Sequence, residues 1–394
     1  MTAVISVVVA LVIIAGLFTA LNMAVDRTPQ RWDDRIRPWI FVGPAMLFMG
    51  IALIVPAIRT VVLSFSGGNR GEEGLTLSNW TDALGDERVL GFGRVGDVLT
   101  SRLTILGIVL LVVGLVVARR SAASVGGGSG GKGDPKLDLS SPFAIIALGA
   151  AGAAILMAVF STLRGVVWNN LWWVVVVAGF ATILGLGIAV LADRSKKETV
   201  AKTLIFMPFA LSLVGAAIIW KYVYDTPGAG QAEGLLNVLW PGDPIDFLRG
   251  STSDGGTIAP WNNFFIMVIM VWIQTGFAMV IISAAIKGVP AELNEAARVD
   301  GANETQVFWR ITLPQITGTI IVVITTLTIT VLKIFDLVKA TTGGAADTDV
   351  LANRVYNELR NGNFTLSSTF AVMIFVLVIP IAYVNIRRNQ GAIQ

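Results

Sequence analysis

The chain has 394 residues, of which 54% are apolar and only 14% are charged, and its mean hydropathy is +0.74. This composition excludes an ordinary water-soluble globular protein and indicates a polytopic α-helical membrane protein. The sequence contains no cysteine and no histidine, which excludes disulfides, thiolate nucleophiles, imidazole bases and most zinc or haem sites.

The apolar residues gather in about nine runs that are long enough to cross a bilayer, which takes roughly 20 predominantly apolar residues. The first run has no basic segment before it and is longer than a signal-peptide core, so we expect it to be a retained span. The nine runs lie near residues 3–25, 39–66, 101–119, 143–162, 169–191, 202–223, 263–287, 316–337 and 367–386.

Lysine and arginine are unevenly distributed between the two sides of the membrane that nine spans would create. If the segment 289–314 is cytoplasmic, the connections on its side hold seventeen of these residues and the connections on the other side hold eight. The positive-inside rule therefore places this segment and the C-terminus in the cytoplasm, and the N-terminus outside. The net charge of +3 has the same origin and is no evidence for nucleic-acid binding.

Between residues 119 and 142 the sequence changes abruptly to glycine, serine and charged residues, the composition of a flexible linker. Gly126, Gly131 and Lys132 have the spacing of a phosphate-binding loop. However, Gly133 stands where a Ser or Thr should hold magnesium, and no buried strand precedes the motif. We therefore expect a cytoplasmic linker and no nucleotide site.

This linker joins two spans that contain almost no polar side chains with which to line a path for a solute. We expect the segment 99–163 to be an inserted transmembrane hairpin, packed as an accessory on the outside of the other spans. The segments 67–100 and 224–262, expected on the outer side, carry turn residues, acids and tryptophans. Connection or anchoring at the membrane interface is favoured for them, and docking of a partner is the alternative.

The polar segment 289–314 lies between two spans and carries helix signals of its own. Pro290 and Glu292 are typical of a helix start, and Gly301 is typical of a helix end. Residues three and four positions apart share one face of this helix, and they are Leu293, Ala296, Ala297 and Asp300.

A second short helix is expected over about Glu304 to Ile311, ending before Leu313-Pro314, where the next span begins. The pair lacks the large apolar face and the basic flanks of a helix that lies on lipid. The alanines and acids favour a helix-turn-helix that fits a groove on another protein.

The stretch "EAARVDGA" followed by "FWRITLP" resembles the EAA loop of ABC-importer membrane subunits. The resemblance implies a coupling helix that sits in a cleft of a separate ATPase subunit and passes its closure to the membrane helices. The expected coupling residues are Glu295, Ala296, Ala297, Asp300 and Gly301, and the remaining matches to the pattern are Ala302, Phe308, Ile311, Leu313 and Pro314.

The wider chain is similar to carbohydrate-uptake permeases of the maltose type, especially the α-glucoside permeases, over residues 39–66 and 166–390. The stretches "VLADRSKKETVAKTLIFMPFALSLVGAAIIWKYVYD" and "LKIFDLVKATTGG" followed by "VLANRVYNE" carry this likeness. One departure is that Ala345 and Ala346 follow Gly344, where many sugar permeases have a proline.

The resemblance implies an all-α fold with a six-span core of the type I importer kind. On that basis the chain divides into an accessory span and link (1–38), a first core span with an external segment (39–98), the inserted hairpin (99–163) and the remaining core (164–394). The coupling loop 289–314 lies within this last part.

The implied function is that of a non-catalytic permease subunit in a prokaryotic cell membrane, carrying a di- or oligosaccharide. The implied partners are a second permease subunit, two ATP-binding subunits and an extracytoplasmic solute-binding protein. ATP and magnesium would be bound by the ATPase subunits, and no cofactor is expected in this chain.

A sugar path inside a membrane requires hydroxyl-binding groups and aromatic faces that point into a wet cavity. The spacing of the candidates places three of them on one face of the eighth span, two on the seventh and two on the sixth. Membrane threonines also bond their own backbone or join helices, and a lysine near a span end also extends to the interface, so these uses are the alternatives. The candidates are Phe209, Ser212, Gln274, Phe277, Thr326, Thr330 and Lys333.

Three other functions are alternatives to an ATP-driven sugar importer. An ion-coupled secondary transporter generally needs carboxylates within the membrane, and the spans contain none apart from Asp336 at the rim of the eighth. An intramembrane enzyme would need a catalytic carboxylate pair or a metal site near a span end, and no suitable spacing occurs. A permease for another solute, such as an amino acid, stays open because the coupling motif says little about cargo.

Overall fold

The computed structural model describes residues 30–67, 74–125, 142–193, 197–225, 234–241, 243–252 and 261–391, with three isolated positions before residue 30. The chain divides into two units, residues 1–63 and 64–394, and each is described by itself. The span expected at 3–25 and the linker with Gly126, Gly131, Lys132 and Gly133 lie outside the described residues.

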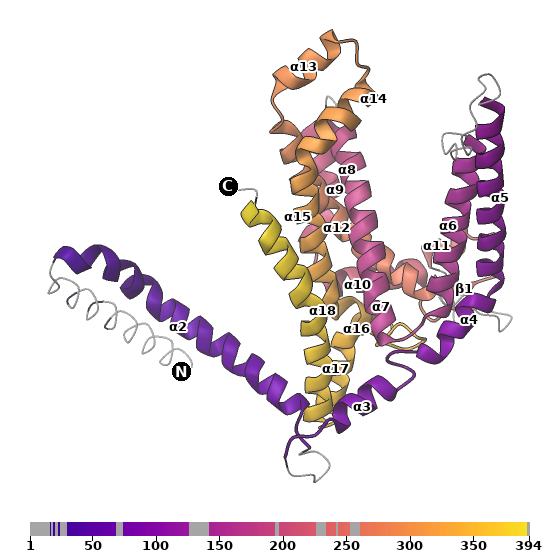
Figure 1. The fold of residues 1–394 in the computed structure, drawn as a ribbon. Coiled ribbons are helices and arrows are strands. Elements are labelled where there is room, and N and C mark those ends of the chain that lie inside the picture. Colours follow the sequence, from indigo (N-terminus) through magenta and orange to yellow (C-terminus); the bar gives the residue numbers. More distant parts are fainter. Residues whose placement is uncertain are drawn as a thin grey trace. The chain divides into compact units, whose positions relative to one another are not determined.

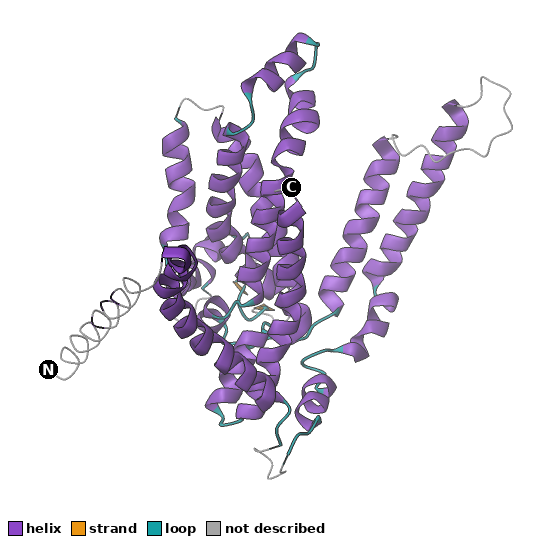
Figure 2. Ribbon diagram, turned by 60° about the vertical axis from the view of Figure 1, so that its left-hand side comes forward, coloured by secondary structure: helices purple, strands orange, loops and turns teal. Residues whose placement is uncertain are grey.

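Helices dominate the described residues (Figure 2), which confirms the all-α membrane fold. The first helix, α2, contains the apolar stretch Ala45–Ser64. The only strands in the described part are β1 and β2, which pair antiparallel over two residues each. The elements that form the spans and their connections are α2 (Gln30–Ser64), α3 (Ser78–Gly85), η2 (Phe92–Arg94), α4 (Val95–Thr100), α5 (Arg102–Val125), α6 (Pro142–Thr162), α7 (Val166–Trp173), η3 (Val174–Ala178), α8 (Gly179–Asp193), α9 (Glu198–Phe206), η4 (Met207–Ala210), α10 (Leu213–Tyr224), α11 (Leu235–Leu239), β1 (Ile245–Asp246), β2 (Ser251–Thr252) and α12 (Trp261–Lys287).

The remaining elements follow α12 and run to the C-terminal end of the described chain (Figure 1). They are α13 (Ala291–Val299), α14 (Glu304–Val307), η5 (Phe308–Thr312), α15 (Leu313–Leu332), α16 (Asp336–Thr341), α17 (Leu351–Arg360) and α18 (Phe364–Gly391).

Seven helical segments of the described chain are long and apolar enough to cross a membrane, and each coincides with an expected span. These segments are Ala45–Ser64, Arg102–Arg119, Pro142–Thr162, Val166–Asp193, Trp261–Lys287, Glu304–Leu332 and Phe364–Val384.

The span expected at 202–223 is not one straight helix. Its two halves, Glu198–Ala210 and Leu213–Tyr224, meet at an angle of 101°. Leu211 and Ser212 are extended at the break, and the Ser212 hydroxyl accepts a hydrogen bond from the Gly215 N–H at 3.0 Å. This bond supplies one of the partners that the first turn of a helix lacks, so the second half begins as an independently capped helix.

The helix expected at Glu304–Ile311 does not end before Leu313-Pro314, so this prediction was wrong. The helix runs without interruption from Glu304 to Leu332 through the π-helical turn η5. In this turn the Leu313 N–H bonds the Phe308 carbonyl, five residues back. Proline lacks an N–H and ordinarily breaks a helix, and a π turn shifts the hydrogen-bond pattern just where Pro314 enters.

The centre of the second unit is α12, whose side chains are mostly buried between neighbouring helices. Two glycines permit its close packing. A Cβ on Gly276 would lie 2.7 Å from the Ile205 carbonyl oxygen, and a Cβ on Gly185 would lie 2.7 Å from the Ala278 Cβ. Small residues of this kind allow membrane helices to approach closely and gain packing contacts.

The hairpin formed by α5 and α6 packs mainly on itself. Gly107 of α5 lies against Ile155 of α6, and Gly114 lies against Leu148. The hairpin reaches the core at its end, where the Phe160 ring meets the Trp172 ring edge to face at 5.0 Å. The long faces of α5 and α6 therefore pack mainly on each other, and the accessory role of this hairpin stays a prediction.

We predict that Gly185→Val destabilises the protein, because the added side chain would meet the α12 backbone. The cost of such overpacking is about 1–3 kcal/mol, and it should appear as a lower thermal unfolding midpoint in lipid nanodiscs. Gly187→Val is the matched control, since a Cβ on this exposed glycine of α8 meets nothing within 4 Å. Equal midpoints for the two variants would contradict the close packing of α8 on α12.

Candidate coupling loop and translocation face

The coupling loop is a pair of helices, α13 and α14, between α12 and α15 at one end of the bundle (Figure 1). Pro290 stands immediately before α13, as expected from the sequence. Asn303 begins α14 with a capping box: its side chain accepts from the Gln306 N–H, and the Gln306 side chain accepts from the Asn303 N–H, both at 2.9 Å. The start of α14 is therefore capped by side chains, whereas α13 begins after Pro290 without a side-chain cap.

Gly301 ends α13 in the left-handed conformation, with φ +85°. The Ala302 N–H bonds the Ala297 carbonyl at 2.9 Å, and the Gly301 N–H bonds the Arg298 carbonyl at 3.1 Å. These two bonds form a Schellman motif, which satisfies carbonyls that a helix end leaves open. A side chain at this position would be strained, although the space around it is free.

An ion pair joins the two helices of the loop. The Arg298 Nε donates to the Glu304 carboxylate at 2.8 Å. This hydrogen bond is the main reason that the pKa of Arg298 is raised. Both side chains are half exposed, so the pair adds little stability, and its effect is to favour one angle between α13 and α14.

The five expected coupling residues lie on this loop, and most of them are exposed. Glu295, Ala296, Asp300 and Gly301 are exposed, whereas Ala297 is buried against the rest of the loop. The exposed surface of α13 combines the polar Glu295 and Asp300 with the apolar Leu293 and Val299.

A polar cluster at the base of the loop was missed by the sequence analysis. The Lys202 ammonium of α9 lies 2.7 Å from the Asp193 carboxylate at the end of α8 and also contacts Ser283 of α12. Glu198 contacts both Lys202 and Lys287. A cavity of about 120 Å³ between Asp193 and the loop adjoins this cluster. The sequence analysis counted basic residues only as positive charges, because Asp193 and Lys287 lie on other helices than Lys202 and Glu198.

On the candidate translocation face, two of the expected aromatic residues meet. The Phe209 ring stacks on the Phe277 ring with centroids 5.6 Å apart and an angle of 18°. Gln274, one turn before Phe277, is buried, and Ser212 caps the second half of the broken span. The structure thus brings the sixth and seventh spans together at these positions.

The expected stripe on α15 faces away from the packed core of the chain. Thr326 and Lys333 are exposed and Thr330 is half-buried, whereas Thr325 and Thr328 of the same helix are buried. The Thr326 and Thr330 hydroxyls donate to the carbonyls four residues earlier, each at 2.9 Å. Each hydroxyl oxygen keeps the capacity to accept a further hydrogen bond.

At the opposite end of α15, asparagine side chains hold the loop that connects α16 and α17. The Asn169 amide donates to the Asp347 and Asp349 carbonyls at 2.7 and 2.8 Å, and the Asn262 amide donates to the Ala346 carbonyl at 2.7 Å. The Asn263 amide in turn donates to the Asn169 side chain at 3.1 Å. These asparagines lie at span ends that the sequence analysis treated only as boundaries.

A family model described as "Binding-protein-dependent transport system inner membrane component" matches residues 138–390. The chain is 35% identical to the alpha-glucoside transport system permease protein AglF of Rhizobium meliloti (strain 1021), over 98% of this chain and 96% of that protein. It is 47% identical to the osmoprotective compounds uptake permease protein GgtC of Synechocystis sp. (strain ATCC 27184 / PCC 6803 / Kazusa), over 57% of this chain and 79% of that protein.

Among solved structures, a bacterial ABC transporter involved in the import of the acidic polysaccharide alginate is similar with a TM-score of 0.55. The match covers 91% of this chain and 99% of that chain at 17% identity, so it concerns the fold alone. Together with the all-α spans and the loop between α12 and α15, these matches show that the chain belongs to the family of binding-protein-dependent transport system inner membrane components, the multi-pass permeases of ABC importers.

Proposed function

We propose that this chain is the permease subunit of an ATP-driven importer that carries an α-glucoside or a related di- or oligosaccharide. The observation that carries the proposal is the unbroken helix from Glu304 to Leu332, which joins the exposed coupling loop to the Thr326 stripe. A movement imposed on α13 and α14 is passed along a rigid helix to the candidate sugar path. The similarity to an alpha-glucoside permease over almost the whole chain supports this cargo.

In this proposal α13 docks in a cleft of a separate ATP-binding subunit. Glu295, Ala296 and Asp300 supply the exposed contact, and the Schellman turn at Gly301 fixes how α13 is presented. ATP and magnesium are bound by two such subunits, while this chain carries out no hydrolysis. A second permease subunit completes the path, and the coupling loop and the C-terminus are cytoplasmic, as the distribution of basic residues indicates.

The sugar passes between two kinds of side chain that suit it. The stacked Phe209 and Phe277 rings offer an apolar face, and Thr330 and Lys333 offer hydrogen-bond partners. Alternating access of this path to the two sides of the membrane then follows the opening and closing of the ATP-binding subunits. The inserted hairpin 99–163 and the N-terminal segment 1–38 are accessories to the core formed by 39–98 and 164–394.

A second candidate cargo is a small osmoprotective solute. The higher identity, 47%, is to an uptake permease for osmoprotective compounds, although it covers only 57% of this chain. Uptake of labelled α-linked disaccharides and of labelled osmoprotective solutes by the reconstituted transporter distinguishes the two cargoes. Saturable uptake of an osmoprotective solute alone would replace the sugar in the proposal.

The first prediction concerns Gly301. Gly301→Val should raise the free energy of the native turn by about 1–2 kcal/mol, because a β-branched residue resists the left-handed conformation. The expected result is faster tryptic cleavage at Arg298 in the purified complex. Gly301→Asn is the matched control, since asparagine tolerates this conformation. Equal cleavage rates for both variants would contradict the role of the turn.

The second prediction concerns the docking contact. Glu295→Lys reverses an exposed charge on α13 and leaves the fold of the chain intact, so insertion into the membrane should be normal. ATP-driven sugar uptake should fall roughly ten- to hundredfold, because coupling free energies between two sites are typically about 1–3 kcal/mol. The measurements are uptake into proteoliposomes and co-purification of the ATP-binding subunits. Normal values of both would overturn the assignment of α13 as the coupling helix.

The third prediction concerns the sugar path. Thr330→Ala removes one neutral hydrogen bond, worth about 0.5–1.5 kcal/mol, so the apparent affinity for sugar should weaken several-fold at unchanged basal ATP hydrolysis. Thr330→Cys should react with a small water-soluble thiol reagent and be protected by bound sugar. Thr328→Cys, buried on the other side of α15, is the matched control and should stay inert. An inert cysteine at position 330 would move the path away from this stripe.

A further inference from the structure

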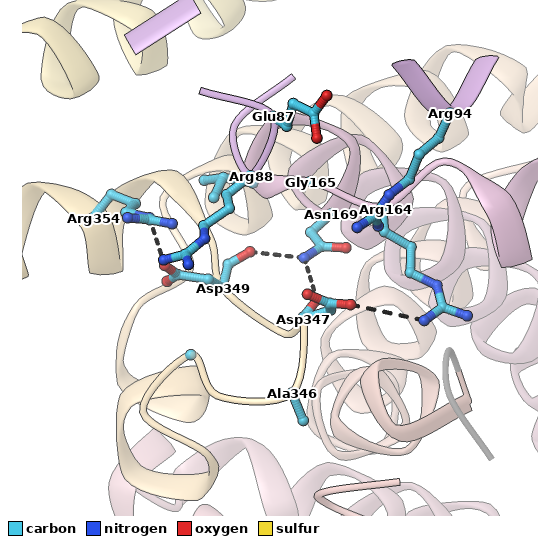
Figure 3. Close-up of a pocket in the computed structure, with 12 residues that line it drawn as sticks. Glu87, Arg88, Arg94, Arg164, Gly165, Asn169, Ala346, Asp347, Asp349 and Arg354 are labelled. Carbon is cyan, nitrogen blue, oxygen red and sulfur yellow. Dashed lines mark hydrogen bonds and ion pairs between the residues drawn. The ribbon is translucent and has the colours of Figure 1, made fainter. Parts of the chain in front are cut away.

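A charged pocket of about 380 Å³ lies at the end of the bundle opposite the coupling loop. It is formed by three segments that are distant in sequence: the connection between α3 and α4, the start of α7 and the loop between α16 and α17 (Figure 3). Its ionisable lining residues are four arginines and three acids, namely Arg88, Arg94, Arg164, Arg354, Glu87, Asp347 and Asp349.

Two of the arginines are already matched by carboxylates within the pocket. The Arg354 Nε lies 2.8 Å from the Asp349 carboxylate, and both side chains are largely buried. An Arg164 nitrogen lies 3.7 Å from the Asp347 carboxylate. These pairs form the fixed floor of the pocket and account for two of its three acids.

The other two arginines, Arg88 and Arg94, are exposed and enter the pocket from the connection between α3 and α4 (Figure 3). Neither forms an ion pair with a carboxylate among the residues that the structure describes. The third acid, Glu87, lies with its carboxylate beside Gly93. The pocket therefore has an excess of one positive charge and two guanidinium groups available to a ligand.

Arg164 lies close to a second positive charge in the pocket. Burial is the main reason that the pKa of the Arg164 guanidinium is lowered, the Asp347 carboxylate opposes this shift, and the positive charge of Arg94 adds to it. Like charges held close together favour an anion between or beside them, because an anion relieves their repulsion.

The backbone at the floor of the pocket is held in a fixed conformation by neighbouring side chains. Ala346 and Asp347 have left-handed φ values of 54° and 59°, which are uncommon for residues other than glycine. Their carbonyls are held by the Asn262 and Asn169 amides, each at 2.7 Å. Strained backbone that neighbouring groups hold firmly is typical of binding sites, because a rigid site loses little entropy when it binds.

We propose that this pocket receives a carboxylate side chain of the extracytoplasmic solute-binding protein, which Arg88 and Arg94 bind. Guanidinium groups match a carboxylate through paired N–H bonds, whereas a neutral sugar needs no such charge. The two arginines are exposed at the side from which that protein would approach. This inference rests on the proposed importer function and names the chemistry of one contact with its partner.

The test uses the complete transporter in nanodiscs and its sugar-loaded solute-binding protein. Arg88→Ala and Arg94→Ala should each weaken binding of that protein by about tenfold, which corresponds to ~1.4 kcal/mol. Arg88→Lys should fall between wild type and Arg88→Ala, because lysine keeps the charge and loses the paired geometry. Arg249→Ala is the matched control, as this arginine is exposed but outside the pocket, and should bind normally.

A charge swap identifies the partner group. An Asp→Arg or Glu→Arg substitution in the binding protein should restore binding to Arg88→Glu permease while weakening binding to the wild type. The difference between wild type and Arg88→Ala should shrink as salt rises from 50 to about 500 mM, since exposed charges are screened. Affinities within twofold for all pocket variants would overturn the inference.

Two further measurements distinguish a failure of this inference from a failure of the proposed importer function. If sodium glucuronate binds the transporter without the binding protein, and Arg88→Ala abolishes this binding, the pocket is a small-anion site and the inference is overturned. If the wild-type complex shows no ATP hydrolysis stimulated by the sugar-loaded binding protein, the proposed importer function fails. Normal stimulation of ATP hydrolysis in the wild type and in both alanine variants would refute the proposed contact at the pocket and leave the proposed importer function intact.

Discussion

The requirement that backbone polar groups be satisfied in lipid controls this structure more than any other constraint. Water is absent from the bilayer core, so an unpaired N–H or C=O there costs several kcal/mol and spans must be helical. At three irregular points of the described chain, other hydrogen bonds replace the regular helical ones. The break before α10 is capped by Ser212, the turn before Pro314 becomes a π turn, and the loop after α16 is held by asparagine amides. Departures from the helix therefore occur where side chains or an altered register can complete the bonding.

The same constraint explains how the loop formed by α13 and α14 connects with α15. In the proposed function, a flexible joint at Leu313-Pro314 would dissipate a movement of α13 and α14, whereas a continuous helix would transmit it. The π turn lets Pro314 enter without such a joint, and the ion pair between Arg298 and Glu304 limits the motion of α13 relative to α14. A π turn at a functional element is a common occurrence in helical proteins. In the proposed function, the continuous helix α15 and the closely packed helices α12 and α8 would move together as one rigid body.

Sequence reasoning located the spans of the described residues, because hydropathy is a local property. It also placed Gly301 at a helix end, since the position needs a left-handed φ that glycine adopts freely. It erred at Pro314 and gave no sign of the break near Leu211, because both features depend on hydrogen bonds to residues several positions away. The polar clusters could not be predicted from the sequence for another reason. Lys202 and Asp193 come together only through the packing of separate spans, and so do the Asn169 amide and the Asp349 carbonyl of the α16–α17 loop.

The loop at Ala345 and Ala346 combines an irregular backbone with side-chain bonds from distant spans. The sequence differs from many sugar permeases in having alanine there in place of proline. Proline requires φ near −65°, and Ala346 has φ +54°, so proline at position 346 is incompatible with this backbone. The left-handed pair at 346 and 347 turns the chain so that the Asp347 carboxylate reaches Arg164, while the Asn169 amide holds the Asp347 carbonyl. In this chain, side-chain bonds from Asn169, Asn262 and Arg164 fix the loop at the position where many sugar permeases have a proline.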